Sequence, residues 1–342
     1  MKKLLYIFCV LLVASCVKHS AENSPESRLE ITARIAEIAD SKVIHEGKDF
    51  KDGNTIGVFV YHSETKDVTS PKEMSEFSSY GSKYRNIRGV IHEVESSKSW
   101  KFNFENATTS FDDIYLLKPK VAPFETGMAV VAYAPWMANV EEIHSIPFTL
   151  GGEFEKQVDL LWARQNTHDR AVNSIDPGAN YKIVPDGNVQ YVNLTFQHAL
   201  SLLRIGLKCG SEDSAVAVSS VLLKRKEGGS TPLCVSGLFD AMIGQIKNSV
   251  EGPKLEFKYT EKVQISTESY TYVPMLIAPQ TYKADGDYIL EFQFDGQQSN
   301  SKYEIKLSDV EGGFKPGNVY TFNFTIDGSI QCDGVTTSDE WI

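Results

Sequence analysis

The 342-residue sequence has few cysteines, little cationic charge and no long apolar run in its body. A membrane-spanning helix needs about 20 consecutive apolar residues, and no segment beyond the N-terminus reaches about 18. The five cysteines include no C-x-x-C pair, so neither a zinc site nor a disulfide framework is indicated. Only 34 Lys and Arg face 45 Asp and Glu, and the formal charge is −11. This balance excludes nucleic acid as a natural partner, because phosphate binding requires a cationic surface.

The motifs of the common enzyme classes are absent as well. No H-E-x-x-H, G-x-S-x-G, P-loop or G-x-G-x-x-G occurs. Val43–Glu46 and Val90–Glu93 share the letters V-I-H-E, but one His-Glu pair on each strand cannot chelate a metal ion alone. Asp285–Asp287 lacks the further ligands of a calcium loop and is interpreted as a hairpin turn. We therefore predict that the protein is not an enzyme, with no catalytic residue, no metal site and no cofactor.

The composition favours a globular, β-rich protein. Hydrophobic residues make up 42% of the chain, which is ample for packed cores and argues against disorder. The chain contains 15 Tyr, 18 Phe and 24 Gly, which favour strands and turns over a helical bundle. The length suggests about two domains.

The N-terminus has the pattern of a secretory signal. Lys2 and Lys3 precede an apolar run from Leu4 to Val13, which is too short to span a bilayer. Small residues then lead directly into Cys16, an arrangement that resembles a bacterial lipobox. We expect residues 1–15 to be a signal peptide and Cys16 to be the lipid-attachment site, with an ordinary signal peptide that contains a cysteine as the alternative. Cleavage would remove two lysines and no acidic residue, so the formal charge would change from −11 to −13.

Residues 16–28 are mostly polar and are interpreted as a tether between the lipid and the first folded element. Three cysteines remain beyond it, at Cys209, Cys234 and Cys332. One bridge, such as Cys209–Cys234, and buried thiols are both compatible with the sequence.

Alternation of apolar and polar residues dominates the body of the chain. Every second residue from Leu29 to Ile35 is apolar, which predicts a first strand, although the stretch to Ala39 also fits a helical turn. Asp159–Ala163 fits either a strand or a loop. Further strands are predicted at Ile56–Tyr61, Trp100–Phe104, Ile114–Leu117, Met128–Tyr133, Val192–Phe196, Leu203–Leu207, Leu255–Tyr259, Tyr288–Phe294, Tyr303–Leu307 and Tyr320–Ile326.

Turn-forming residues concentrate between 165 and 188, and we place a domain boundary there, with domains at 29–187 and 188–342. The alternation beyond it buries one face of each strand, which is typical of antiparallel sheets. Several such strands separated by Gly, Asp and Asn turns predict an all-β fold of β-sandwiches.

Four segments carry a resemblance to a known family. Val192–Lys208 resembles the strand–His-Ala–strand segment of the fimbrillin family of Bacteroides and its relatives. Phe50–Tyr61 is similar to an early turn and strand of that family, and Val273–Gln280 to its hydrophobic strand that ends in Pro-Gln. Pro316–Ile326, followed by Trp341, resembles its penultimate strand and terminal tryptophan. These segments extend over nearly the whole chain.

The resemblance implies two tandem β-sandwich domains of transthyretin-like topology and a role as a fimbrial subunit or adhesin. It also implies a lipidated precursor, carried to the outer membrane and the cell surface, that an arginine-specific protease shortens at its N-terminus. A strand from a neighbouring subunit then fills the vacated groove. The implied partners are other fimbrial subunits, the outer membrane through acyl chains (palmitate among them), and a host or bacterial surface ligand.

Carried onto this sequence, the cleavage site falls at Arg28 or Arg34. Arg28 lies in the expected tether, where a cut would free the lipid without emptying the groove. Arg34 lies inside the expected first strand, and a cut there would remove half of it. The alternative for each is a surface arginine that is never cut.

The C-terminal residues 327–342 are mostly polar, which is weak patterning for a polymerising strand. They fit a tail that packs on its own domain at least as well, and therefore a tip or accessory subunit. A second interpretation is an outer-membrane surface lipoprotein that binds glycans or other ligands without polymerising. Trp100, Trp136 and Trp162 are candidates for such binding, with packing in a core as their alternative.

Overall fold

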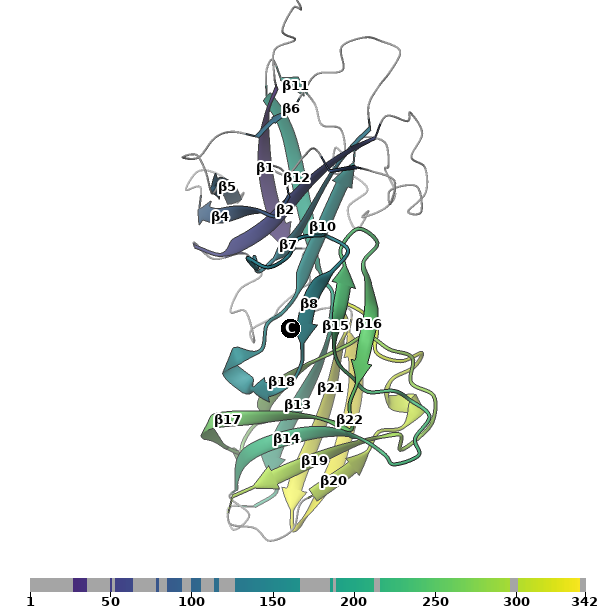
Figure 1. Ribbon diagram of the computed structural model, residues 1–342. Coiled ribbons are helices and arrows are strands. Elements are labelled where there is room, and N and C mark those ends of the chain that lie inside the picture. The colour runs from purple at the N-terminus through teal and green to yellow at the C-terminus, as the bar shows by residue number, and fades with distance from the viewer. Residues whose placement is uncertain are drawn as a thin grey trace, which may run out of the picture.

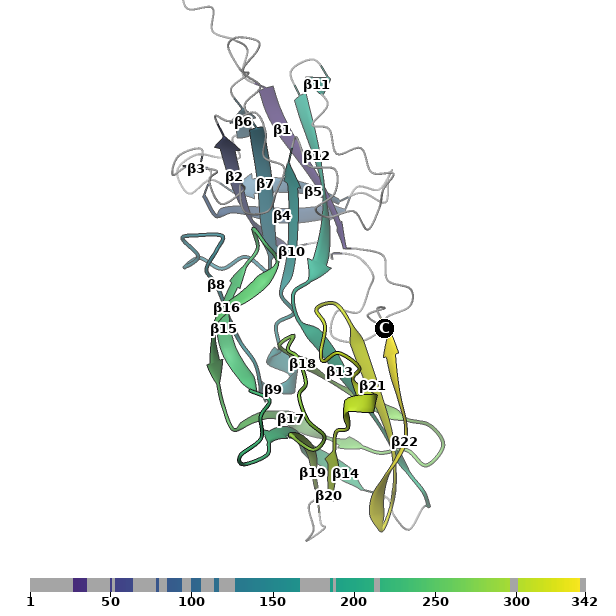
Figure 2. The ribbon, with the colours of Figure 1, turned by 90° about the vertical axis from the view of Figure 1, so that its right-hand side faces the viewer.

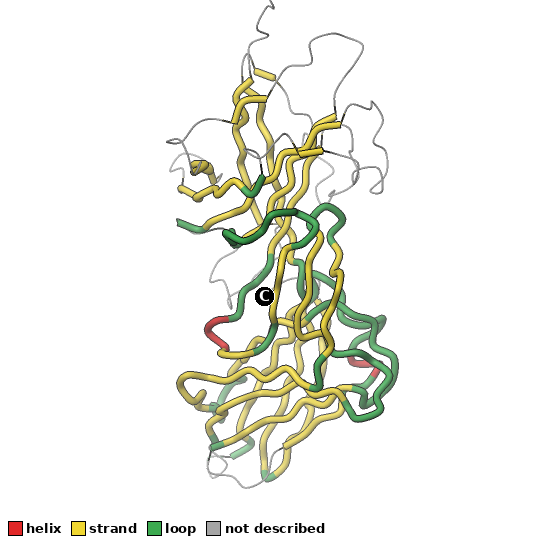
Figure 3. The backbone as a smooth tube through the Cα atoms, in the orientation of Figure 1, coloured by secondary structure: helices red, strands yellow, loops and turns green. Residues whose placement is uncertain are grey.

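The computed structural model describes residues 27–35, 50, 53–63, 78–79, 85–93, 100–105, 114–116, 127–166, 185–186, 189–211, 216–295 and 301–338. Within these ranges nearly all regular structure is β, and the helical elements are two short 3-10 turns, η3 (Phe154–Lys156) and η5 (Leu307–Asp309), as Figure 3 shows. The all-β prediction is confirmed. None of the helical segments described here has the length or apolar character to cross a membrane.

The first sheet occupies one end of the molecule (Figure 1). Its strands follow the order β11-β12-β10-β7-β2-β4-β5-β1-β6, and β3 pairs with β2. A further pairing between β12 and β1 joins distant members of this order, so the sheet closes into a ring. The strand bounds are β1 Ser27–Ile35, β2 Thr55–Ser63, β3 Ser78–Ser79, β4 Ile87–Glu93, β5 Trp100–Glu105, β6 Ile114–Leu116, β7 Gly127–Ala134, β10 Leu161–Asn166, β11 Pro185–Asp186 and β12 Val189–His198.

Strands β2 and β7 form the centre of the first sheet's core. Residues Val130 to Ala134 of β7 are buried in succession, and so are Ile56 to Phe59 of β2. Burial of consecutive residues means that both faces of these strands are covered. One face is enclosed by the ring, so the second cover must come from other parts of the chain.

Two larger sheets form the C-terminal sandwich at the other end. One has the order β18-β13-β21-β22 and the other β20-β19-β14-β17-β9. Their aromatic side chains meet in the core, where the rings of Phe292 and Phe324 lie 5.3 Å apart. The bounds are β9 Gly152–Glu153, β13 Ser201–Cys209, β14 Ala217–Arg225, β17 Lys254–Gln264, β18 Thr271–Ile277, β19 Tyr288–Phe294, β20 Ser301–Glu304, β21 Val319–Asp327 and β22 Ser329–Ser338.

A smaller sheet, β16-β15-β8, lies between the two ends of the molecule (Figures 1 and 2). Its strands are β8 (Ile146–Thr149), β15 (Cys234–Asp240) and β16 (Gln245–Glu251). The segment between β7 and β10 thus leaves the first sheet, pairs through β8 and β9 with strands of the C-terminal half, and returns. This excursion and the β15–β16 hairpin connect the two ends.

The chain passes from the first sheet to the C-terminal sandwich through two buried residues, Ala199 and Leu200. The amide of Ala199 donates to the Leu160 carbonyl at 2.8 Å, and the Ser201 hydroxyl donates to the Lys315 carbonyl at 2.8 Å. At the end of β12, Nδ1 of His198 lies 2.7 Å from the Asp159 carboxylate, and both side chains are largely buried. Hydrogen bonds from both ends of the molecule therefore fix this passage.

By its pairing, β12 belongs to the first sheet, although the sequence places residues from 188 onward in the second domain. The turn-forming residues from 165 to 188 include β11 and precede β12, so they end before the chain leaves the first sheet. The division into domains at 187/188 stays a prediction. The sheets themselves change at residues 199–200.

Candidate functional site

Strand β1 is an interior strand of the first sheet. Along one edge it pairs in parallel with β12, from Arg28 opposite Val189 to Ile35 opposite Phe196. Along the other edge it pairs with β6 near its start and with β5 at Thr32 and Ala33. Figure 2 shows β1 and β12 side by side. The sequence-predicted strand from Leu29 to Ile35 is confirmed, and the helical alternative is wrong for these residues.

The strand's bounds correct two expectations about the arginines. Arg28 does not lie in the tether, because β1 begins at Ser27 and Arg28 has partners on both sides. Arg34 is the penultimate residue of β1, so a cut after it would remove all of the strand except Ile35 rather than half of it. Whether either bond is cleaved stays a prediction. Cys16 and the expected signal peptide lie outside the described residues.

Apolar side chains lie along the strand that β1 covers. Leu194 and Phe196 of β12 are buried, and they stand opposite Ala33 and Ile35 in the register. The ring of Phe196 packs edge-to-face on Phe50 at 5.1 Å. Without β1, the facing backbone edge of β12 would lose its partners and the ring of strands would open, which creates a template for another strand.

Strand β22, the last one described, is an edge strand among the described residues, in contrast to the interior strand β1. It pairs with β21 along its length and has no partner on its other edge among the described residues. The hydroxyls of Tyr270 and Thr325 donate to its Asp333 carboxylate at 2.9 and 2.7 Å. Most of its residues are exposed or half-buried. The tail up to Ser338 therefore packs on its own domain, as one of the two sequence-based interpretations expects.

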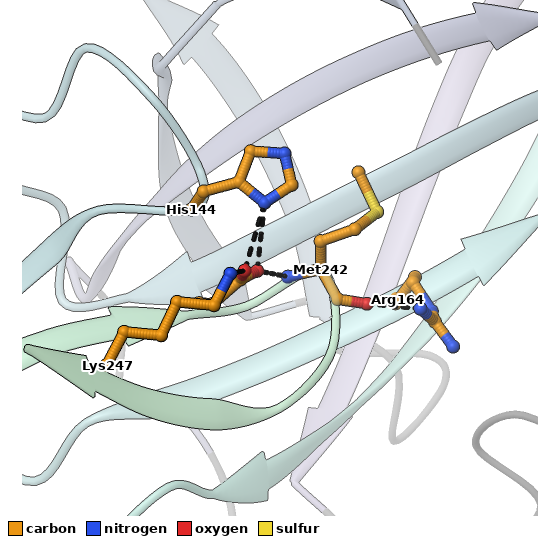
Figure 4. Close-up of polar contacts among 5 residues, drawn as sticks. His144, Arg164, Met242 and Lys247 are labelled. Carbon is orange, nitrogen blue, oxygen red and sulfur yellow. Dashed lines mark hydrogen bonds and ion pairs between the residues drawn. The ribbon is translucent and has the colours of Figure 1, made fainter. Parts of the chain in front are cut away.

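A buried carboxylate lies at the tip of the β15–β16 hairpin (Figure 4). Asp240, 1% exposed, accepts hydrogen bonds from Nδ1 of His144 at 3.0 Å, from the Met242 amide at 2.9 Å and from Lys247. We call Asp240 and these three partners the Asp240 cluster. Burial of this carboxyl disfavours its charged form, but the bonds from His144 and Lys247 outweigh that effect and hold its pKa below the ordinary value.

The Asp240 cluster connects the hairpin to the first sheet. The Arg164 guanidinium, on β10, donates to the Met242 carbonyl, and the Ala241 amide donates to the Ile143 carbonyl at 3.1 Å. Trp162, also on β10, lies against Phe239 with ring centroids 5.9 Å apart. These contacts supply the second cover of the first sheet near β10, and they make the two ends of the molecule one packed body at this point.

The predicted ligand-binding tryptophans have packing roles where the structure describes them. Trp162 belongs to the contact just described. Trp136 donates through Nε1 to the Asn86 carbonyl at 3.2 Å, and the Arg88 guanidinium lies 5.4 Å from its ring centroid. The side chain of Trp100 lies outside what the structure describes.

The three cysteines and the Asp285–Asp287 turn make contacts within the protein in the described residues. Cys209, Cys234 and Cys332 form no disulfide with one another, and burial raises the pKa of the Cys234 thiol. Asp287 accepts hydrogen bonds from the amides and hydroxyls of Ser230 and Thr231, which fixes the turn before β19. In the described part of the chain, no three His, Cys, Asp or Glu side chains gather as metal ligands would. Val43–Glu46 lies outside the described residues.

Comparison with known families decides the relationship. Residues 42–341 match the fimbrillin-like family. The chain belongs to the fimbrillin-like family. The family prediction made from the sequence is therefore confirmed.

Two solved Bacteroides structures share the fold of this fimbrillin-like chain. A Bacteroides ovatus protein assigned to cell adhesion has a TM-score of 0.57 at 16% identity, with 93% of this chain and 98% of that chain covered. A Bacteroides uniformis protein with the same assignment has a TM-score of 0.55 at 14% identity and the same coverage. The tip fimbrial protein Mfa3 from Porphyromonas gingivalis has a TM-score of 0.44 at 10% identity, covering 93% and 100%. No curated protein matches the sequence.

Proposed function

We propose that this fimbrillin-like protein is a non-enzymatic fimbrial subunit of the bacterial cell surface, and that it accepts a strand from a neighbouring subunit after its own β1 is removed. The observation that carries the proposal is the interior position of β1, paired with β12 on one edge and with β5 and β6 on the other. Removal of an edge strand leaves a smaller sheet. Removal of an interior strand leaves a gap that another strand can fill.

The energetics support strand replacement. An incoming strand would restore the backbone partners of β12 and cover its apolar residues. If it buries about five side chains at ~1.5–3 kcal/mol each, it contributes on the order of 10 kcal/mol before the cost of ordering it. A contribution of this size is enough to hold a stable non-covalent polymer together.

Between the two candidate sites, the register favours Arg34 as the processing site. A cut after Arg34 leaves only Ile35 of β1 in place, whereas a cut after Arg28 leaves most of the strand paired with β12. A cut at either position would also separate the folded protein from the proposed acyl chains on Cys16. We propose that those chains hold the precursor at the outer membrane until then.

The position of β22 supports a tip or accessory subunit over a stalk subunit. Because β22 pairs with β21 from Asp327 opposite Ser329 to Val319 opposite Ser338, it would have to leave its own sheet before it could be donated. We therefore propose that the subunit receives a strand and does not donate its own. Its surface ligand would be bound elsewhere on the molecule.

Electron microscopy of cells that express the protein, with N-terminal sequencing of the surface-assembled material, tests this function. The expected result is fibres that contain the protein with a new N-terminus at Ile35. Arg34→Lys should block the new N-terminus and incorporation into fibres, whereas the matched Arg28→Lys should leave both intact. Assembled material that begins at Cys16 would contradict removal of β1.

A second candidate function, a surface lipoprotein that binds ligands without polymerising, is favoured by the same self-pairing of β22. The packed environments of Trp136 and Trp162 argue against these aromatic residues as its glycan-binding site. Absence of fibres together with binding on a glycan array would support this alternative.

A further inference from the structure

We infer that the first sheet itself protects the Arg34–Ile35 bond, so that β1 must detach locally from β12 before a protease can cut it. This inference rests on the proposed function and concerns how that processing is controlled. It would make the fold, and not only the protease, determine when the precursor matures.

The register places the bond inside a ladder. Arg34 and Ile35 stand opposite Thr195 and Phe196 in the parallel pairing with β12. Proteases bind the residues around a scissile bond as an extended segment, commonly through backbone pairing of their own. A segment whose backbone is already paired in a sheet cannot take up that position. The bond is therefore cut from an open state in which this part of β1 has left β12.

The two arginines differ in their place along β1. On the edge opposite β12, the described pairing of β1 with β5 covers Thr32 and Ala33, and the register partners of Arg34 and Ile35 among the described residues lie on β12. Arg28 has partners on both edges, in Val189 and Tyr115. Fraying from the C-terminal end of β1 thus exposes the bond after Arg34 before it exposes the bond after Arg28.

The partner strand stays in place when β1 frays. The C-terminal end of β12 is held by pairing of Gln197 and His198 with β10, and by the bond of His198 to Asp159. Local openings of this kind cost less free energy than global unfolding, and cleavage from them follows the population of the open state. The groove remains formed while β1 leaves it.

The test measures cleavage of the full-length protein in detergent by an arginine-specific endoprotease, scored as the appearance of an N-terminus at Ile35. The reference is a synthetic peptide with the sequence of residues 27–42. We expect the bond in the folded protein to be cut at least about tenfold more slowly than in the peptide, because only the open fraction is a substrate. A rate equal to that of the peptide would show that the bond is exposed in the native state and would overturn the inference.

Two matched variants distinguish local from global opening. Leu194→Ala removes a buried side chain of β12 opposite Ala33, and Leu203→Ala removes an equally buried one from β13 opposite Tyr320. Local opening predicts about tenfold faster cleavage for the first variant and little change for the second. Equal acceleration by both, or by neither, would overturn the inference.

The wild-type protein supplies an independent readout if Leu194→Ala does not fold. Low concentrations of urea should accelerate cleavage with a smaller slope than that of global unfolding, because local opening exposes little surface. A slope equal to the global one would contradict the inference. Fibres formed by a protein that is cut as fast as the peptide would refute the protection and leave the proposed function intact. Slow cleavage that is followed by no assembly would support the protection of the bond and refute the proposed function.

Discussion

Strands β1 and β22, the first and last that the structure describes, differ in what each one closes. They are of similar length, nine and ten residues, and each pairs along most of its length with one long partner. Strand β1 has partners on both edges and completes a ring, whereas β22 lies at the edge of an open sheet. The number of backbone hydrogen bonds is therefore a poor guide to a strand's importance. Its position in the sheet determines what its removal exposes.

The side chains on the partner strands of β1 and β22 also differ. Leu194 and Phe196 lie on β12, the partner that β1 covers. Phe322 and Phe324, on the partner of β22, pack against Tyr303 of the opposite sheet and keep that contact without β22. Ile330, Cys332 and Val335 of β22 pack against the sandwich core from half-buried positions, so loss of β22 would thin the cover of that core. Loss of β1 would open the ring and expose the backbone edge of β12 beside its apolar residues.

The largest expected effect is that of removing β1. A chain that begins at Ala36 should lose on the order of 5 kcal/mol of stability in the first sheet, at about 1 kcal/mol for each net backbone hydrogen bond. Hydrogen exchange should show β12 deprotected and the C-terminal sandwich unchanged. The matched truncation ends at Gly328 and removes β22, and it should deprotect only β21. Equal losses from the two truncations would break the comparison.

A smaller effect is expected at the contact that connects the two regions. Asp240→Asn removes the charge that His144 and Lys247 bind, which should cost about 2 kcal/mol. Calorimetry should show the unfolding transitions of the first sheet and the sandwich moving apart. Asp295→Asn, which removes an exposed partner of Lys262, is the control and should cost less than about 1 kcal/mol. Similar costs would show that the Asp240 cluster does not couple the regions.

The same carboxylate predicts an acid dependence. The pKa of Asp240 in the folded protein lies below its ordinary value of 3.8, so folding favours the ionised form. Its contribution to stability is complete above about pH 3.8 and is lost as the pH falls through the lowered folded value. Urea denaturation between pH 7 and pH 3 should show wild type losing more stability than Asp240→Asn. Parallel curves would contradict this assignment.

The smallest effect concerns a single glycine in the β15–β16 turn. Gly244 has φ +68°, and a Cβ atom there would clash with the Trp162 ring. Gly228 has φ +77° with open space around it. Gly244→Ala should therefore cost about 1 kcal/mol more than Gly228→Ala, because both carry the backbone strain and only the first meets a neighbour. If the two variants lower Tm by the same amount, the Trp162 ring moves aside at no cost, and the expected difference is contradicted.

Local patterns in the sequence predicted many of the strands. Alternation at Leu203, Ile205 and Leu207 matches buried positions of β13, and alternation from Tyr320 to Ile326 matches β21. The pattern did not reveal β15 and β16, because most of their residues are partly or fully exposed and lack an apolar period. Strand β8, only four residues long, left no signal of its own.

Long-range pairing had no local signature. Nothing near Leu29 indicates that its strand will lie beside residues 189–196, because parallel pairing is decided by the closure of the whole sheet. The Asp240 cluster was missed for a similar reason, since His144 comes from a loop nearly a hundred residues away. The family resemblance indicated a removable first strand. The strand bounds in the structure then showed how much of β1 a cut after Arg28 or Arg34 would remove.

The two-residue passage at Ala199 and Leu200 gives the molecule a mechanical axis. A strand seated against β12 is bonded to a segment that continues almost directly into β13, which pairs in parallel with β21. If a neighbouring subunit's strand takes the place of β1, as we propose, a pull on that strand would act along β12 and, through residues 199–200, along β13 in its parallel ladder with β21. Such a pull runs along the strands, so the hydrogen bonds of a ladder would share the load in shear and would not open one after another.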